Sequence, residues 1–140
     1  MRNLPRLKAQ LRRHEGIRYK PYKDTVGKLT IGVGRNLDDK GISESEADMM
    51  LDNDIKDACL DASSVPGFSG ADPVRQCVLI NMVFNMGLYR VMRFKKMIAA
   101  ILQKNWHEAS KEMLDSKWAD QVGKRAAELS EQMRTGRWGG

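Results

Sequence analysis

Apolar residues recur at helical spacing from the start of the chain. Three leucines fall on one face of the first segment: Leu4, Leu7 and Leu11. Pro5 suits the first turn of a helix, where its missing N–H is no loss. The spacing predicts a first helix over residues 4–14, which Gly16 ends. Glu15 then lies at the carboxyl end of this helix, where the helix dipole is negative.

The pattern changes between Tyr19 and Gly34, where β-prone residues are separated by glycines. The β-prone or apolar members are Tyr22, Val26, Leu29, Ile31 and Val33. The glycines allow tight bends between short extended runs. This segment predicts a small β-hairpin or short meander, which needs a helix packed behind it to be stable.

A second helix is predicted over residues 44–62. Ser43 and Glu46 have the spacing of a capping box, in which each side chain bonds the backbone of the other. One apolar face follows, made of Ala47, Met50, Leu51, Ile55, Ala58 and Cys59. Residues 63–71 contain one proline and two glycines and are predicted to be a linker.

The rest of the chain is predicted to be helical. Asp72 and Pro73 form a strong helix start, and Gly87 ends that helix. Residues 77–86 are apolar on all sides, which predicts a helix buried among others. Three amphipathic segments follow, marked by Val91/Phe94/Ile98/Ile101, Trp106/Ala109/Met113 and Ala126/Leu129/Met133. Gly136 is placed to end the last of them.

These elements predict an α+β fold that is predominantly helical and has two lobes. Residues 1–62 form a front lobe of first helix, β-hairpin and connecting helix, and residues 63–140 form a helical back lobe. A chain of 140 residues is the size of one compact domain. We expect a monomer.

Composition and charge narrow the classes of protein. Hydrophobic residues make up 41% and charged residues 30%, which excludes a disordered chain. No apolar run approaches the roughly 20 residues that span a bilayer, and basic residues interrupt the region where a signal peptide would have its apolar core. We therefore expect no stable membrane insertion. The net charge of +6 favours an anionic partner such as nucleic acid, acidic lipid or cell wall.

Other residues point to packing rather than chemistry. Cys59 and Cys77 lie in apolar helical patterns; one disulfide between them is possible in number, but they are predicted to be buried, reduced thiols. The two histidines lack metal-ligand spacing, so neither a metal nor another cofactor is expected. Trp106 and Trp118 are predicted to pack in the core or between the lobes, and the nine methionines are predicted to fill the core.

Two carboxylates fit the chemistry of glycoside hydrolysis. That reaction needs one carboxyl group to protonate the leaving oxygen and a second to activate water or attack the sugar. Glu15, at a helix end, and Asp24, on the hairpin, are suited by type and by predicted placement. Their spacing alone is weak evidence, because most single carboxylates are exposed surface groups.

The surrounding residues carry a specific resemblance. Glu15-Gly16, Asp24-Thr25 and the run Thr30-Ile31-Gly32-Val33-Gly34 are followed by matching blocks at residues 79–87, 106–109, 116–118, 125–126 and 134–138. In this collinear order the chain resembles the phage-type lysozymes, the T-even-like endolysins of glycoside hydrolase family 24.

The resemblance implies a muramidase that cuts the β-1,4 bond between N-acetylmuramic acid and N-acetylglucosamine in peptidoglycan. It implies inversion, with Glu15 as acid, Asp24 as base and Thr30 helping to hold the attacking water. Inversion requires carboxyl groups roughly 6.5–9.5 Å apart. Arg125 is implied to approach and orient the glutamate. A phage enzyme of this kind would wait in the host cytoplasm until a holin opens the membrane.

Some positions depart from the family pattern. The stretch between Asn36 and Ser43 is shorter than in well-known members, which predicts a reduced front lobe. Asn36 stands where a leucine lines the cleft, and Phe84 keeps its match at the cleft wall, so both are candidate substrate-binding residues. Arg35 replaces a histidine. Two positions that contact substrate in relatives differ in type: Met97 and Glu112.

Three alternatives stay open. A lytic transglycosylase would use a single glutamate and would not need Asp24 or Thr30. A non-catalytic wall-binding module could keep a lysozyme scaffold, although both acids are present here. A nucleic-acid binder would suit the charge, but no recognised nucleic-acid motif accompanies it, so we expect no nucleic-acid partner.

Overall fold

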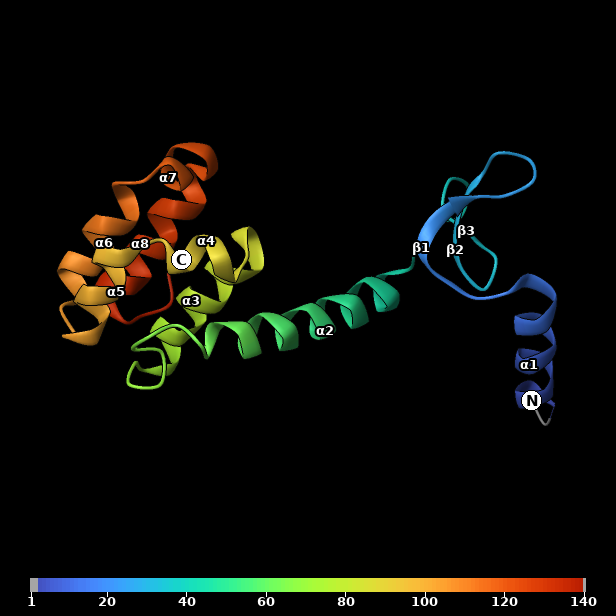
Figure 1. Ribbon diagram of the computed structural model, residues 1–140, viewed down its shortest axis with the longest axis horizontal. Helices are drawn as coiled ribbons and strands as arrows, with labels where there is room; N and C mark the ends of the chain where they lie inside the picture. The colour runs from blue at the N-terminus through green and yellow to red at the C-terminus, as the bar shows by residue number, and fades with distance from the viewer. Residues whose placement is uncertain (1–2, 140) are drawn as a thin grey trace. The chain divides into compact units, whose positions relative to one another are not determined.

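The computed structural model describes residues 3–139, which form eight helices and one small antiparallel sheet (Figure 1). The helices are α1 (Leu4–Glu15), α2 (Glu44–Ala62), α3 (Pro73–Met86), α4 (Leu88–Met92), α5 (Lys95–Leu102), α6 (Trp106–Leu114), α7 (Lys117–Val122) and α8 (Lys124–Thr135). The strands are β1 (Arg18–Lys23), β2 (Leu29–Gly32) and β3 (Arg35–Asn36). The predicted α+β, predominantly helical class is confirmed.

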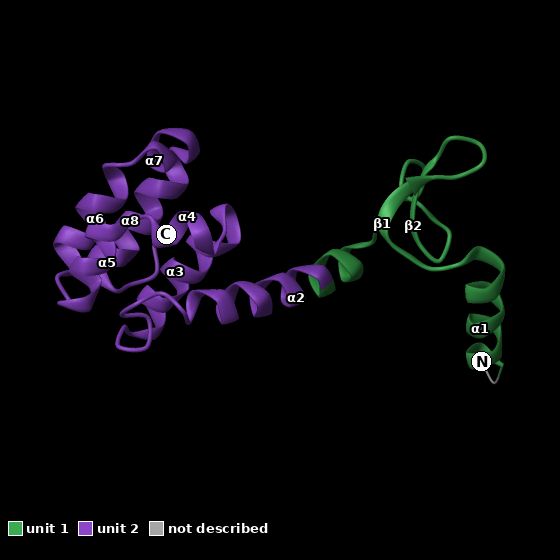
Figure 2. Ribbon diagram, viewed as in Figure 1, with its two compact units in different colours: residues 1–49 green, residues 50–140 purple. Residues whose placement is uncertain are grey.

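The chain divides into two compact units, one up to residue 49 and one from residue 50 (Figure 2). The boundary falls within α2, whereas the sequence divides the lobes after that helix; the assignment of residues 1–62 and 63–140 to two lobes stays a prediction. No helix among residues 3–139 combines the length and apolar character needed to cross a bilayer.

Helix α1 carries Glu15 as its last residue, one position beyond the predicted end. The helix stops there because Gly16 takes a positive φ of 73°, which glycine adopts without strain. The Gly16 N–H donates to the carbonyl of Arg12 at 2.8 Å and closes the last turn. The predicted roles of Pro5 in the first turn and of Gly16 as the stop are both confirmed.

The sheet of the first unit is a three-stranded meander in the order β1-β2-β3, which confirms the predicted hairpin or meander. Thr30 in the middle strand lies opposite Tyr22 of β1 and Asn36 of β3. The turn between β1 and β2 closes with the Asp24 N–H donating to the Lys28 carbonyl at 2.9 Å. This turn and the middle strand carry two of the predicted catalytic residues.

The link from β3 to α2 depends on one ion pair. Arg35 Nη2 lies 2.7 Å from Glu46 Oε2, and Arg35 Nη1 donates to the carbonyl of Gly41 at 3.2 Å. Glu46 also accepts the Ser43 N–H at 2.9 Å, while the Ser43 hydroxyl accepts the Glu46 N–H at 3.2 Å. The predicted capping box and the helix over residues 44–62 are confirmed.

The core of the second unit is built mainly from helices α3, α5, α6 and α8, with contributions from α4 and from the segment between α2 and α3. Its largest fully buried side chains are Val65, Val78, Leu79, Met82, Val91, Met97, Ile101, Met113 and Met133. Four of them are methionines, as expected for flexible core-filling residues. Trp118 is also buried, and Trp106 packs against the core from a half-buried position.

Arg75 joins the start of α3 to the end of α8. Its Nε donates to the carbonyl of Met133 at 2.7 Å, and its Nη2 donates to that of Arg134 at 3.0 Å. The guanidinium lies 4.3 Å from the centre of the Trp106 ring. A Cβ on Gly136 would lie 2.9 Å from Arg75 Nη1, so glycine is needed there for space as well as for its φ of 69°.

Two expectations about burial are wrong. Cys59 is exposed and Cys77 is half-buried, although both are free thiols as predicted. Only Ala58 and Ala62 of α2 are buried, and they form a stripe one helical turn long. Cys59 follows Ala58 and is therefore rotated about 100° around the helix axis from this stripe. Helix α3 is likewise buried along one stripe rather than all round, because Phe84 is 44% exposed.

The Arg35–Glu46 pair predicts a pH dependence. The hydrogen bond from Arg35, followed by those from Ser43, lowers the pKa of Glu46 from its ordinary 4.5 to about 2. A lowered folded-state pKa gives stability that is complete above about pH 4.5 and is lost as the pH falls towards 2. We expect the difference in thermal midpoint between the wild type and Glu46→Gln to shrink across this range, as followed by circular dichroism.

Glu44→Gln is the matched control for this prediction, because Glu44 is an exposed glutamate in the first turn of the same helix. It should show no such change with pH. A difference between wild type and Glu46→Gln that stays constant from pH 6 to pH 2 would contradict the assigned role of the ion pair.

Candidate active site

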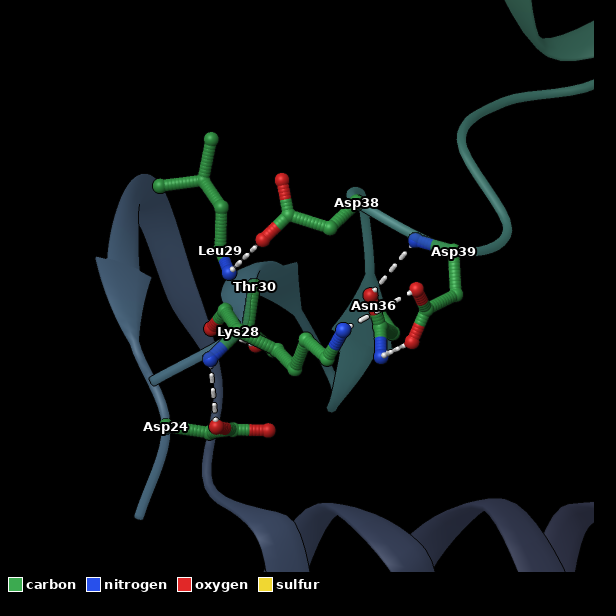
Figure 3. Close-up of polar contacts among 7 residues, drawn as sticks. All are labelled: Asp24, Lys28, Leu29, Thr30, Asn36, Asp38 and Asp39. Carbon is green, nitrogen blue, oxygen red and sulfur yellow. Dashed lines mark hydrogen bonds and ion pairs between the residues drawn. The ribbon is translucent and has the colours of Figure 1, made fainter. Parts of the chain in front are cut away.

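The carboxylate of Asp24 is fixed at the tip of the β1–β2 hairpin. Its Oδ1 accepts the Val26 N–H at 3.0 Å. The same oxygen accepts the Lys28 N–H at 2.8 Å, as Figure 3 shows. Its own backbone carbonyl accepts the Gly27 N–H at 3.0 Å. Within residues 3–139 no protein group donates to the other oxygen, Oδ2. The turn therefore orients the carboxylate and leaves one of its oxygens for a ligand or water.

Thr30 lies in the middle strand with only 3% of its surface exposed. Its hydroxyl donates to the carbonyl of Lys28 at 2.9 Å, which fixes the hydroxyl hydrogen and leaves the oxygen able to accept another hydrogen bond. Lys28 thus binds the Asp24 carboxylate through its N–H and the Thr30 hydroxyl through its C=O. Both side chains are tied to the same residue.

The carboxyl group of Glu15 lies against the backbone of Gly34. A Cβ built on Gly34 would lie 2.9 Å from Glu15 Oε2, and the φ of Gly34 is 66°. Gly34 lies in the turn between β2 and β3, whereas Asp24 lies in the turn that precedes β2. The first unit therefore places the two acids at opposite ends of β2, with Thr30 between them.

Asn36 is held by the loop that follows β3. Its Nδ2 donates to Asp39 Oδ2 at 2.9 Å, and its Oδ1 accepts the Asp39 N–H at 2.9 Å. Asp39 Oδ1 also lies 3.2 Å from Lys28 Nζ, and Asp38 Oδ2 accepts the Leu29 N–H at 2.7 Å. Lys28, Asp38 and Asp39 were not predicted as site residues. The only sequence signal for Asp38 and Asp39 is that they are consecutive acids in a loop. Lys28 has no such signal.

The two candidate residues of the second unit lie on helices of its core. Phe84 is partly exposed on α3. Arg125 on α8 donates from Nε and Nη2 to Asn81 Oδ1 at 3.0 and 2.7 Å. Its partner within this unit is therefore an amide. The approach of Arg125 to Glu15 stays a prediction.

A pocket of about 650 Å³ lies on the second unit. Phe94 and Trp118 meet edge to face on its wall, with ring centres 6.1 Å apart. Met97 and Glu112, the two altered positions, also line it. Its other charged lining residues are Arg90, Arg93, Lys95, Lys96, Asp115 and Lys117. Five cations against two acids make this pocket suited to an anionic group.

The sequence predicts no metal site. Among residues 3–139 no group of three histidine, cysteine, aspartate or glutamate side chains is arranged to hold a metal ion. The predicted catalytic residues of the first unit are two carboxyl groups and a hydroxyl.

Comparison with known proteins finds likeness along nearly the whole chain. Residues 12–135 match the family described as phage lysozyme. The chain is 32% identical to probable T4-type lysozyme 1 of Dictyostelium discoideum, over 93% of this chain and 94% of that protein. It is 30% identical to probable T4-type lysozyme 2 of the same organism, with the same coverage. The pre-baseplate central spike protein Gp5 of Enterobacteria phage T4 is 30% identical over 90% of this chain but only 27% of that protein.

The contact between Gly34 and Glu15 yields a structural prediction. An added methyl group in Gly34→Ala would overlap Glu15 Oε2, so we expect the carboxyl group to be displaced. NMR of the Glu15 side-chain carboxyl carbon should report a changed chemical shift.

Gly32→Ala is the control, because Gly32 has nearly the same φ, 69°, with nothing within 4 Å of its added Cβ. It carries the same backbone strain without the contact and should leave the Glu15 signal in place. Equal shifts in the two variants would mean that strain, and not the contact, governs the position of Glu15.

Proposed function

The chain belongs to the phage lysozyme family, and on that premise we propose that it cuts the β-1,4 bond between N-acetylmuramic acid and N-acetylglucosamine with inversion. Membership of the family makes it a lysozyme, a glycosidase whose substrate is bacterial peptidoglycan. The bond, the stereochemistry and the residue roles are our proposal. The Lys28 backbone, which holds Asp24 and Thr30 together, is the observation that carries it.

Asp24 is proposed to be the base. Its Oδ1 is occupied by two backbone N–H groups, so Oδ2 is the oxygen that can take a proton from water. Thr30 is proposed to hold the same water, because its hydroxyl hydrogen is committed to Lys28 and its oxygen can accept from the water. A water held by both residues would be oriented for attack on the sugar.

Glu15 is proposed to be the acid that protonates the leaving oxygen. Its carboxyl group is exposed and lies on the backbone of Gly34, at the other end of β2 from Asp24. An inverting enzyme needs its two carboxyl groups apart, so that water fits between one of them and the sugar. Arg125 is proposed to orient Glu15, as in the family pattern.

Substrate contacts are proposed for Asn36 and Phe84. The Asn36 amide is held by Asp39, which fixes its orientation towards a sugar hydroxyl or amide. Phe84 offers an exposed aromatic surface. The pocket with five cations could take the acidic peptide stems of the wall.

The biological setting is proposed from the family. A phage lysozyme that lyses its host acts after a holin opens the membrane, and we propose this role for a monomeric enzyme waiting in the host cytoplasm. The two T4-type lysozymes from Dictyostelium discoideum and the baseplate spike protein show that relatives occur in other settings. The chemistry proposed here is independent of that setting.

The assignment of Glu15 predicts that Glu15→Gln loses activity. An amide cannot donate the proton, and loss of general acid catalysis costs about 10²–10⁴-fold in rate. We expect at least a 100-fold slower fall in the turbidity of chloroform-treated Gram-negative cells. Glu44→Gln makes the same change at an exposed position on α2 and should keep full activity.

Substantial activity in Glu15→Gln would overturn the catalytic assignment. If the wild-type protein instead bound peptidoglycan in a pull-down without releasing products, a non-catalytic wall-binding module would be favoured.

The products test the mechanism. Inverting hydrolysis of a β bond gives reducing ends that are first formed as the α anomer. We expect this anomer in NMR spectra recorded during the first turnovers, and ordinary reducing-end muropeptides by mass spectrometry. The β anomer as first product would exclude inversion. A 1,6-anhydro product would mean that the enzyme is a lytic transglycosylase.

A further inference from the structure

The outer edge of β2 is paired over only part of its length. Strand β3 lies opposite Thr30 and Ile31 and ends at Asn36. Leu29, the next residue towards the hairpin tip, is therefore beyond the end of β3. A strand edge left without partners keeps its N–H and C=O groups free and its backbone less constrained.

The loop after β3 supplies the missing partners. The Leu37 N–H donates to the Leu29 carbonyl at 2.7 Å. Asp38 Oδ2 accepts the Leu29 N–H at 2.7 Å, as Figure 3 shows. A carboxylate accepting a backbone N–H is a short, charge-assisted hydrogen bond, stronger than one between neutral groups. The side chain of Asp38 thus completes the ladder where β3 has already ended.

Leu29 lies between Lys28, whose backbone holds the Asp24 carboxylate, and Thr30. The backbone groups of Lys28 face β1 and bind Asp24 and the Thr30 hydroxyl, whereas those of Leu29 face the loop. Successive residues of a strand point their backbone groups to opposite edges. The backbone from Lys28 to Thr30 is therefore held from both sides, and Asp38 is the only side chain that acts on the Leu29 N–H in the described chain.

We propose that Asp38 is a positioning residue for the hydrolysis. By holding the Leu29 N–H, it fixes the backbone that places the Asp24 carboxylate and the Thr30 hydroxyl on the attacking water. The inference rests on the roles proposed above for Asp24 and Thr30. Asp38 itself touches neither of them and carries no proton in the reaction.

The neighbouring Asp39 makes different contacts from Asp38. Its ion pair with Lys28 Nζ joins two exposed side chains, 61% and 44% accessible, and such pairs contribute little. Its stronger contacts are with the Asn36 amide, on the proposed substrate side. The effect on water activation is therefore assigned to Asp38 and not to the charge of the loop as a whole.

The test compares three substitutions of Asp38 by their kcat and KM on soluble peptidoglycan fragments. Asp38→Ala removes the acceptor and should lower kcat at least tenfold with KM changed less than twofold. Asp38→Asn keeps an oxygen that can accept the N–H and should retain at least half of the wild-type kcat. Asp38→Glu keeps the charge but moves the carboxylate, and should resemble Asp38→Ala.

Asp48→Ala is the matched control, since it removes one exposed aspartate from the same unit and should leave kcat and KM unchanged. Wild-type kcat in Asp38→Ala would overturn the proposal, as would an Asn variant no better than Ala. If Asp38→Ala does not fold, as judged from circular dichroism, the contrast between Asp38→Asn and Asp38→Glu decides in its place.

A double-mutant cycle separates positioning from a general loss of structure. Asp38 is proposed to act through the water that Asp24 and Thr30 hold together, and Thr30→Ala already disrupts that water site. Asp38→Ala should therefore lower the residual kcat of Thr30→Ala by a smaller factor than the tenfold or more expected in the wild type. Equal losses in both backgrounds would overturn the proposal. Failure of the wider function would appear differently, as full activity in Glu15→Gln, whatever Asp38→Ala does.

Discussion

The backbone of Lys28 is the constraint on which the proposed water site depends. Its N–H donates to Asp24 Oδ1 at 2.8 Å, and its C=O accepts from the Thr30 hydroxyl at 2.9 Å and from the Asp24 N–H at 2.9 Å. Lys28 is the last residue before β2, and its backbone groups have no rotamers, so neither side chain can turn freely without losing a hydrogen bond. Catalytic groups need this kind of support, because small displacements reduce the rate sharply. The identity of the side chain at position 28 matters less than the place of its backbone.

Glu15 depends on two glycines rather than on hydrogen bonds. Helix α1 must end at Gly16, with a φ of 73°, for the chain to turn into β1 immediately after the acid. Gly34 has no side chain where the carboxyl group lies, and a Cβ there would displace it. The glycines of the Glu-Gly and Thr-Ile-Gly-Val-Gly segments thus have a physical reason: one ends the helix, and the other provides the surface on which the acid lies.

Local signals predicted much of the fold, because a helix start or stop is decided by a few neighbouring residues. The capping box of Ser43 and Glu46 and the start at Asp72 were found in this way. The two acids could be chosen among eighteen only through the chain-long resemblance. The contact of Asp38 with Leu29 spans nine residues and exists because β3 stops early, which no periodicity indicates. Cys59 was misjudged because an apolar pattern shows neither how wide a buried stripe is nor where it ends.

The segment after β3, which the resemblance predicts to be shorter than in other family members, shows how a reduced front lobe can hold the proposed catalytic residues. Leu37 and Asp38 close the edge of β2, and the Gly41 N–H returns to the Asn36 carbonyl at 3.2 Å. The Gly41 carbonyl accepts from Arg35, which also holds the capping glutamate of α2. Few residues therefore support the strand that carries Thr30 and begin the next helix. A longer segment would add surface beside the sheet, but it is not needed to hold Asp24 or Thr30, so the shortening should affect which glycans bind more than how the bond is cut.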